Sequence, residues 1–334
     1  MTVGRSYART DPGRKRRGNE DAYVCRPPLF AIADGMGGAQ AGEVASALAA
    51  EALTDVQANG SGERRVAALV QEANRRVHQR ASTDASTSGM GTTITVAVVE
   101  DDGAVTFGHV GDSRAYLLRG GALEQLTDDH SLVAELVRRG ELSPAEAEVH
   151  PQRSVITRAL GTDPDIDVDT FTFRAQPGDL FLICSDGLSD MLDRDTIESI
   201  LRAHRDDLES ASRALVQAAN RAGGEDNITA VLFEIADDGR VPAGEPDERT
   251  REYAPSFVDE DTLHPEDHVL PPPPAPAADD TMVVPVEAIE QAPTPEPAED
   301  TEPEATLARK ALALAVIVAL CALIVVLVLW GLAR

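Results

Sequence analysis

Short runs of mainly apolar residues follow one another between residues 92 and 127. The runs are TTITVAVVE, AVTFGHVG, RAYLLRG and ALEQLT, with the turn residues DDG, DS and G between them. Runs of this length, rich in β-branched and aromatic residues and bounded by Asp, Gly and Ser, predict β-strands. Because the connections are short, we expect these strands to form an antiparallel meander.

A second pattern, with apolar residues three or four positions apart, predicts helices. It covers VAALVQEANRRVHQRA (residues 66–81) and DLESASRALVQAANRAGG, which should be helical up to Gly223. Ser143, followed by Pro144 and Glu146, predicts a capping box that opens another short helix. Strands and helices come in separate blocks, so the expected fold class is α+β with antiparallel sheets.

Residues 311–332, ALALAVIVALCALIVVLVLWGL, form a long apolar run without a charge. As a helix the run would be about 33 Å long at about 1.5 Å per residue, which matches the hydrocarbon core of a bilayer. A buried core helix is the alternative, but the length favours a membrane span. We therefore expect residues 307–334 to be one transmembrane helix with basic flanks. Arg309 and Lys310 precede the run, so the positive-inside rule predicts a single-pass protein of the cell membrane with its other residues in the cytoplasm.

Residues 237–306 contain 14 of the 21 prolines and carry a net charge of −17. A segment this acidic, with almost no aromatic residues, cannot bury enough apolar surface to fold. We expect a disordered, self-repelling, Pro-rich linker that acts as a tether without a specific partner. Residues 1–236 are then the working domain.

The net charge of the chain is −27, which argues against a nucleic-acid partner, because such a partner requires a basic surface. The three cysteines are an odd number without a CxxC pair, so a disulfide framework is not expected. Cys184 is expected to be a core residue. Among residues 1–236 the histidines form no HxxH or HxxxH pair, so a His-based zinc site is not expected there.

Four aspartates lie where a predicted strand meets a loop. They are Asp34 after LFAIA, Asp112 after TFGHVG, Asp186 after DLFLICS, and Asp226 just before NITAVLFEI. Taken singly, each is explained by the tendency of Asp to cap and bend loops. Together they suggest ligands of a hard cation, because converging carboxylates repel one another and oxygen ligands suit Mg²⁺ or Mn²⁺. Asp190, in SDGLSD, is instead expected to cap an approaching helix.

Two stretches leave alternatives open. The first, FAIADGMGGAQAGEVAS (residues 30–46), could be a phosphate-binding loop, but it fits neither GxxxxGK[ST] nor GxGxxG, and Asp34 would repel a pyrophosphate. The second, RTDPGRKRRGNEDAY, is either a solvated basic loop or part of a site. In the site, Arg16 or a neighbour would bind phosphate while Glu20 and Asp21 bind metal-bound waters.

The motifs, taken in order, resemble the metal-dependent (PPM, type 2C) serine/threonine protein phosphatases, specifically their bacterial branch. The resemblance covers about residues 3–236. It rests on TDPGRKRRGNED, ADGMGGAQAGEVAS, GTTITVAVV, HVGDSRAYLLRGG, LTDDHS, HPQRSVITRALG, GDLFLICSDGLSD and GGEDNITAVL. It implies two stacked antiparallel β-sheets flanked by helices, with a metal centre at one end of the sandwich.

Carried over position by position, the resemblance implies a site for two or three Mn²⁺ or Mg²⁺ ions. Asp34 would bridge two ions, and the carbonyl oxygen of Gly35 would bind the second. Asp186 and Asp226 would complete the first.

The same resemblance assigns further roles around these ligands. Asp112 resembles the ligand of a third ion in bacterial members, with Ser154 as a companion. Glu20 and Asp21 match acidic positions that order metal-bound water, and Arg16 matches the phosphate-binding arginine.

The implied function is hydrolysis of phosphoserine and phosphothreonine in proteins by a metal-activated water, opposing membrane-associated Ser/Thr kinases. Phosphorylated proteins, including such kinases and their substrates, are the implied partners. Residues 130–160 would form a flap beside the active site. Met36 stands where many eukaryotic members have His, so the general acid is unassigned. The alternative is a catalytically silent module that binds phosphoproteins, although the retained carboxylates speak against it.

Overall fold

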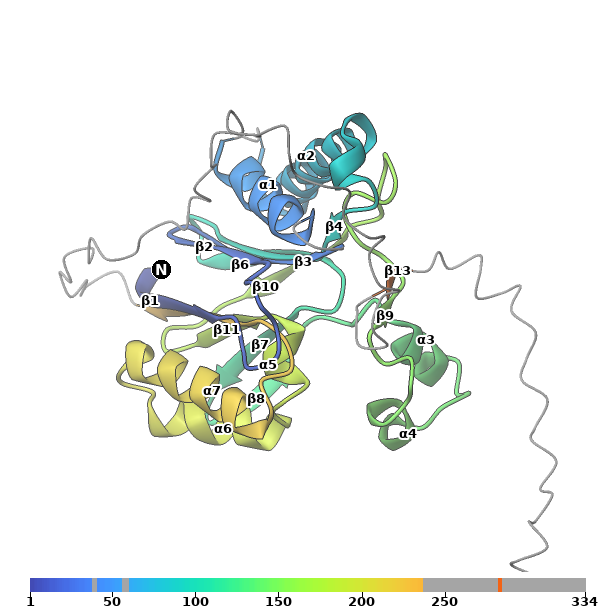
Figure 1. Cartoon of the computed structure of the whole chain (residues 1–334). Coiled ribbons are helices and arrows are strands. Elements are labelled where there is room, and N and C mark those ends of the chain that lie inside the picture. Colours follow the sequence, from blue (N-terminus) through green and yellow to red (C-terminus); the bar gives the residue numbers. More distant parts are fainter. Residues whose placement is uncertain (38–40, 56–59, 237–281, 284–334) are drawn as a thin grey trace, which may run out of the picture. The chain divides into compact units, whose positions relative to one another are not determined.

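The computed structural model describes residues 1–37, 41–55, 60–236 and 282–283 of the chain. In these residues two β-sheets, here called A and B, lie face to face, and helices cover the outer face of each (Figure 1). Within each of the two sheets, neighbouring strands are antiparallel. The expected α+β class with two stacked antiparallel sheets is confirmed.

Sheet A contains the first strand and the last long strand of residues 1–236 as neighbours, with Tyr7 opposite Leu232. Its strand order is β1-β12-β11-β7-β8. The strands are β1 (Thr2–Asp11), β7 (Arg114–Arg119), β8 (Ala122–Gln125), β11 (Leu180–Cys184) and β12 (Ile228–Ala236).

Sheet B has the order β10-β6-β5-β3-β2, with β4 paired to the end of β3. Its strands are β2 (Asp21–Arg26), β3 (Leu29–Met36), β4 (Gly91–Thr92), β5 (Ile94–Val99), β6 (Ala104–Val110) and β10 (Asp169–Arg174). The strand expected to stop at Asp34 continues for two residues, because Gly35 and Met36 pair with β4.

Two of the four helices on the outer faces match predicted segments. Helices α1 (Ala41–Asp55) and α2 (Gly62–Thr83) pack their apolar faces on sheet B, and α6 (Arg194–Ala203) and α7 (Leu208–Ala222) pack on sheet A. The predicted helix 66–81 lies inside α2, and Gly223 is the C-cap of α7, with φ +153°. The remaining short elements are the 3₁₀ turn η1 (Ala85–Thr87), α3 (Leu132–Arg138), α4 (Pro144–Glu148) and α5 (Asp186–Ser189).

A column of phenylalanine rings fills the space between the two sheets. Phe30 of sheet B stacks on Phe233 of sheet A with ring centroids 4.1 Å apart, and Phe233 stacks on Phe181 at 5.0 Å. Phe107 joins the column 5.9 Å from Phe181. All four side chains are fully buried. Aromatic side chains bury large areas, so these rings fix how the strands of one sheet lie on those of the other.

The expected meander over residues 92–127 is wrong in one respect. The pairs β5–β6 and β7–β8 are antiparallel hairpins as predicted, but they belong to different sheets. Between β6 and β7 the chain crosses the sandwich over residues 111–113, beginning at Gly111, whose φ is +113°. A residue with a Cβ at this position would place it 2.5 Å from Cβ of Thr93, so the crossing requires glycine.

The flap region, residues 130–160, carries α3 and α4 and the short strand β9 (Val155–Ile156). Ser143 forms the predicted capping box with Glu146 at the start of α4. Strand β9 pairs in parallel with β13 (Met282–Val283), which comes from the segment expected to be a linker without a partner. The role of the segment as a linker stays a prediction. The other residues of 237–306 lie outside the described part of the chain.

The apolar run 311–332, predicted to span the membrane, falls outside the residues that the structure describes. Among the described helices, none combines the length and hydrophobicity needed to cross a bilayer.

Candidate metal centre

The predicted acidic residues come from both sheets and meet at one end of the sandwich. Asp34 lies near the end of β3, and Asp21 is opposite it in the β2–β3 register. Asp112 follows β6, Asp186 follows β11 as the first residue of α5, and Asp226 precedes β12. Because β11 and β12 are antiparallel, the end of one strand and the start of the next lie at the same edge. The fold therefore brings the candidate carboxylates together.

Burial and mutual repulsion show how closely these carboxylates interact. Burial, reinforced by Asp21 and Asp186, raises the pKa of the Asp34 carboxyl well above its usual value. Burial also raises the pKa of Asp186, with Asp112 and Asp226 adding repulsion. Each ionised group therefore opposes ionisation of the others. Such a cluster is stable in its charged form only with positive charge among its oxygens.

Two oxygen atoms in the cluster lack the partners that buried oxygens normally have. In the described part of the chain, Oδ1 of Asp21 and Oδ1 of Asp186 are buried and accept no hydrogen bond. The other oxygen of Asp21, Oδ2, accepts hydrogen bonds from Ser185 Oγ at 2.9 Å and from Thr229 Oγ1 at 2.5 Å. Unpaired buried carboxylate oxygens fit a divalent cation of the Mg²⁺ or Mn²⁺ type. Within the described residues, no three His, Cys, Asp or Glu side chains already form a cage for an ion.

Gly35 is required for a reason that the sequence did not reveal. A Cβ at this position would lie 2.1 Å from the carbonyl oxygen of Gly42 in α1 and 2.6 Å from that of Glu20. At Gly35 the neighbouring backbone itself fills the space that a side chain would need. Gly38, the third glycine of the motif, lies outside the described residues.

The basic N-terminal stretch reaches the acidic cluster through Arg16. The guanidinium of Arg16 donates from Nη2 to Oδ2 of Asp226 at 2.7 Å, and its side chain is 32% exposed. Glu20 is positioned by its backbone, whose carbonyl accepts from Gly35 N at 3.2 Å. Burial raises the pKa of Glu20 to about 7 against the attraction of Arg16. The structure places Arg16, Glu20 and Asp21 at the carboxylate cluster.

The flap approaches the cluster through Arg153, the neighbour of Ser154. Its guanidinium lies 4.0 Å from Oδ2 of Asp190 and 3.7 Å from Oε2 of Glu225. Ser154 itself lies in the turn that leads into β9. Its predicted role as a ligand stays a prediction.

Asp190 does not cap an approaching helix, so that expectation is wrong. The N-cap of α6 is Asp193, whose carboxylate accepts from Thr196 N at 2.8 Å. Asp190 follows α5, four residues after Asp186, and interacts electrostatically with that residue. Residues four apart on a helix share a face, so the spacing of SDGLSD was a signal that Asp190 belongs to the acidic cluster. Cys184, by contrast, is fully buried in the core as predicted.

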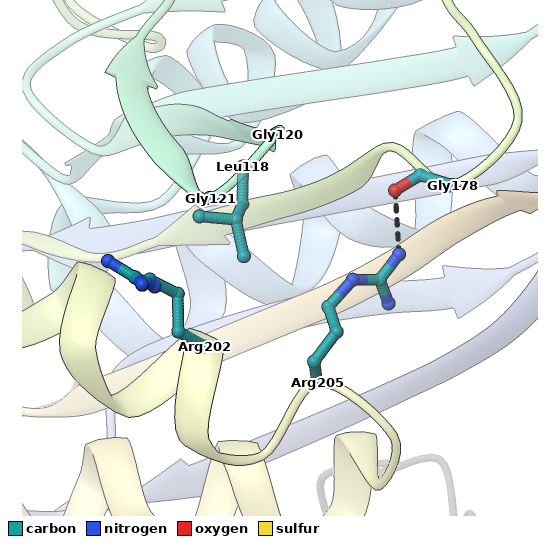
Figure 2. Close-up of a pocket in the computed structure, with 6 residues that line it drawn as sticks. All are labelled: Leu118, Gly120, Gly121, Gly178, Arg202 and Arg205. Atoms are coloured by element: carbon teal, nitrogen blue, oxygen red, sulfur yellow. Dashed lines mark hydrogen bonds between the residues drawn. The ribbon is translucent and has the colours of Figure 1, made fainter.

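A pocket of 210 Å³ lies at the opposite end of sheet A and is not the candidate site (Figure 2). It borders the β7–β8 turn and the residues before β11, whereas the acidic cluster lies before β7 and after β11. Its lining residues are Leu118, Gly120, Gly121, Gly178, Arg202 and Arg205. Arg205 already donates to the Gly178 carbonyl at 2.7 Å and to Glu234 at 2.9 Å.

The raised pKa values predict how pH affects stability without metal. Burial raises the pKa of Asp112 to about 7, so the native state keeps a proton that the unfolded chain loses near pH 4. Stability is therefore lost as pH rises through the folded-state pKa. Burial lowers the pKa values of His109 and His130, so these residues change stability in the opposite direction. They make stability fall as pH drops below about 6.5.

We expect the unfolding free energy in a chelator to fall between pH 6.5 and 8.5. Asp112 alone contributes about 1 kcal/mol to this loss. Asp34 and Asp186 add to it, and the more exposed Glu20 adds less because solvent screens its charge. Urea unfolding at several pH values, with and without Mn²⁺, measures the effect. Stability in the chelator that is constant or rising over this range would contradict it.

The comparisons with known proteins agree with this geometry. The protein-family model for Protein phosphatase 2C matches residues 18–232. The serine/threonine phosphatase stp of Listeria monocytogenes is 40% identical over 238 residues, which cover 68% of this chain and 94% of that protein. The crystal structure of the Mycobacterium tuberculosis serine/threonine phosphatase PstP/Ppp is similar with a TM-score of 0.66 and 38% identity, covering 70% of this chain and 100% of that one. A structure of the PstP catalytic domain in complex with two manganese ions gives a TM-score of 0.65 and 36% identity, with 71% and 100% covered. The chain belongs to the protein phosphatase 2C family.

Proposed function

We propose that this chain is a metal-dependent phosphatase that hydrolyses phosphoserine and phosphothreonine in proteins. The observation that carries the proposal is the buried aspartate cluster with two unpaired oxygens, beside an arginine that solvent can reach. Relatives that cover 68% and 70% of the chain are named serine/threonine phosphatases, and one structural neighbour holds two manganese ions. Phosphorylated proteins, including bacterial Ser/Thr kinases and their substrates, are the proposed partners.

The residues present can hold the cations that the family implies. Asp34, Asp186 and Asp226 offer carboxylate oxygens, and Gly35 offers its carbonyl oxygen. Bound Mn²⁺ or Mg²⁺ would lower the pKa of a water and so supply a nucleophile at neutral pH. Asp21 has its Oδ2 fixed by two hydroxyl groups, and its Oδ1 is buried without a hydrogen bond, so Oδ1 would be available to orient a metal-bound water.

Arg16 can bind a phosphoryl group, whereas Met36 cannot act as the general acid. A guanidinium carries five N–H donors, so Arg16 can bond Asp226 and still meet the oxygens of a phosphoryl group. Charge that develops on those oxygens during hydrolysis is stabilised by such a donor. Met36 packs with Ile156 and Ala159 of the flap region. Its thioether has no proton to give, so the leaving oxygen must be protonated by another group.

Hydrolysis of a phosphothreonine peptide by the full chain tests the proposal. Turnover is expected with Mn²⁺ and should vanish in a chelator. If the protein is folded and binds Mn²⁺ but produces no phosphate, it is instead a phosphoprotein-binding module.

We further propose that the chain is anchored in the cell membrane by residues 307–334, with residues 1–236 in the cytoplasm. The uncharged run 311–332 and the preceding Arg309 and Lys310 support this. The acidic residues 237–306 would act as the tether. An anchor would raise the effective concentration of the phosphatase near membrane-bound kinases.

The anchor predicts where the protein is found after cell lysis. The full chain should sediment with membranes, resist alkaline washing and be released by detergent, because about 20 apolar residues suffice for a stable span. A matched chain that ends at residue 306 should stay in the soluble fraction. A full chain that is folded and found in the soluble fraction would contradict the anchor.

A further inference from the structure

His130, at the base of the flap, connects three segments that are far apart in the sequence. Its side chain is buried, with 3% of the residue exposed. Its Nδ1 lies 3.0 Å from the backbone nitrogen of Gly111, and its Nε2 lies 3.1 Å from Oδ2 of Asp169. Its backbone N–H donates to the Gly111 carbonyl at 2.8 Å, and its carbonyl accepts from Thr157 N at 2.8 Å. Residues 111–113, which cross from one sheet to the other, are here called the crossing loop. His130 therefore joins this loop to both ends of the flap and to strand β10.

The directions of these hydrogen bonds fix the state of the ring. A backbone N–H can only donate, so Nδ1 of His130 accepts from Gly111, and the ring proton of the neutral imidazole lies on Nε2. That proton faces the carboxylate of Asp169 and forms a charge-assisted hydrogen bond. Asp169 also accepts from Arg158 at 2.6 Å through Oδ1. Both bonds to Asp169 therefore come from the flap region, one from each end.

The crossing loop is held by its short length, by the backbone conformation of Gly111 and by hydrogen bonds to His130. Gly111 has φ +113°, a conformation that few other residues adopt, and the loop is three residues long. Asp112 follows Gly111 directly and is buried in the acidic cluster. Both backbone hydrogen-bonding groups of Gly111 are bonded to His130. The orientation of the Asp112 carboxylate therefore depends on His130 through one peptide unit.

We propose that His130 is a positioning residue that fixes the Asp112 loop and the base of the flap in one geometry for cation and substrate binding. The proposal rests on the proposed phosphatase function for its effect on activity, but its structural part does not. Outer-shell residues that orient metal ligands typically change metal affinity by about 10-fold to 100-fold when they are lost. The geometry of His130 assigns it this role for Asp112.

Hydrogen exchange in the metal-free full chain tests the structural part. In H130A the Gly111 N–H loses its acceptor, so its exchange should accelerate by at least about 10-fold, whereas exchange in β11 should not change. In H130N the Asn oxygen can replace Nδ1 as the acceptor, and protection of Gly111 should largely return. R158M is the matched control, because it removes the other partner of Asp169 and leaves the Gly111 bond in place.

The dependence of hydrolysis on Mn²⁺ concentration tests the proposed effect of His130 on cation binding. The Mn²⁺ concentration for half-maximal hydrolysis should rise about 10-fold in H130A, less in H130N, and little in R158M. Unchanged exchange at Gly111 in H130A would overturn the proposal, as would an unchanged Mn²⁺ requirement. An equal effect of R158M would also overturn it, because the cause would then be general loosening of the flap. Absence of phosphatase activity in the wild type would refute the proposed function while leaving the exchange result to decide the role of His130.

Discussion

Replacing Asp34 with Asn is expected to reduce hydrolysis of a phosphothreonine peptide by about 1,000-fold or more. Asp34 is the carboxylate whose pKa burial and four neighbouring aspartates raise, so it lies at the electrostatic centre of the cluster. An amide at this position keeps the shape but removes the charge that would hold a cation. Initial rates at saturating Mn²⁺, measured beside D186N, give the size of the loss.

The stability of the same variant shows whether a loss of activity comes from a lost metal site or from a lost fold. D34N removes a repelled carboxylate, so in a chelator at pH 8 the variant should be more stable than the wild type by about 1 kcal/mol. The matched control is D195N, which makes the same chemical change at an exposed position of α6; it should leave the rate unchanged and should not raise stability, because an acidic residue in the first turn favours a helix. Substantial activity in a folded D34N variant would show that Asp34 does not hold the metal.

Replacing Arg16 with Ala is expected to lower kcat/KM by about 100-fold. The guanidinium is paired with Asp226 at 2.7 Å, so its removal takes away a phosphate contact and also frees a carboxylate of the cluster. R16K should recover only part of the loss, because an ammonium group cannot reproduce the fork that binds two oxygens at once. Steady-state kinetics with a phosphothreonine peptide separate the effects on KM and kcat.

The neighbouring residue supplies the control for this prediction. Arg17 is exposed, and R17A should change kcat/KM by less than about threefold, because exposed charges in water act weakly. If R16A and R17A have the same small effect, the stretch is a general basic loop. The pairing with Asp226 would then have no part in catalysis.

Local features were predicted well because they depend on residues close together in the chain. The apolar spacing of residues 66–81 lies within α2, and the capping box of Ser143 and the stop at Gly223 are where the pattern placed them. A helix face or a cap is decided by side chains within a few positions, so its signal survives in the sequence. The aspartates at strand ends were likewise visible as a recurring pattern.

The errors concern contacts between distant residues. The short connection between β6 and β7 resembled a hairpin, but Gly111 lets the chain cross to the other sheet. Asp190 looked like a cap until its position four residues after Asp186 placed it at the acidic cluster. The motif LTDDHS contains His130, but nothing in the sequence indicated its contacts, because its partners Gly111 and Asp169 are 19 and 39 residues away.

The sequence by itself determined the α+β class, helices α2, α4 and α7, the family, and the acidic residues of the candidate centre other than Asp190. Only the tertiary structure decided which strands share a sheet, which carboxylates face one another and why Gly35 must be glycine. The physical reason is that local propensity acts over one or two turns, whereas burial depends on every segment that packs nearby. The repulsion that raises the pKa of Asp34 does not exist until five aspartates, spread from residue 21 to residue 226, are brought to one end of the sandwich.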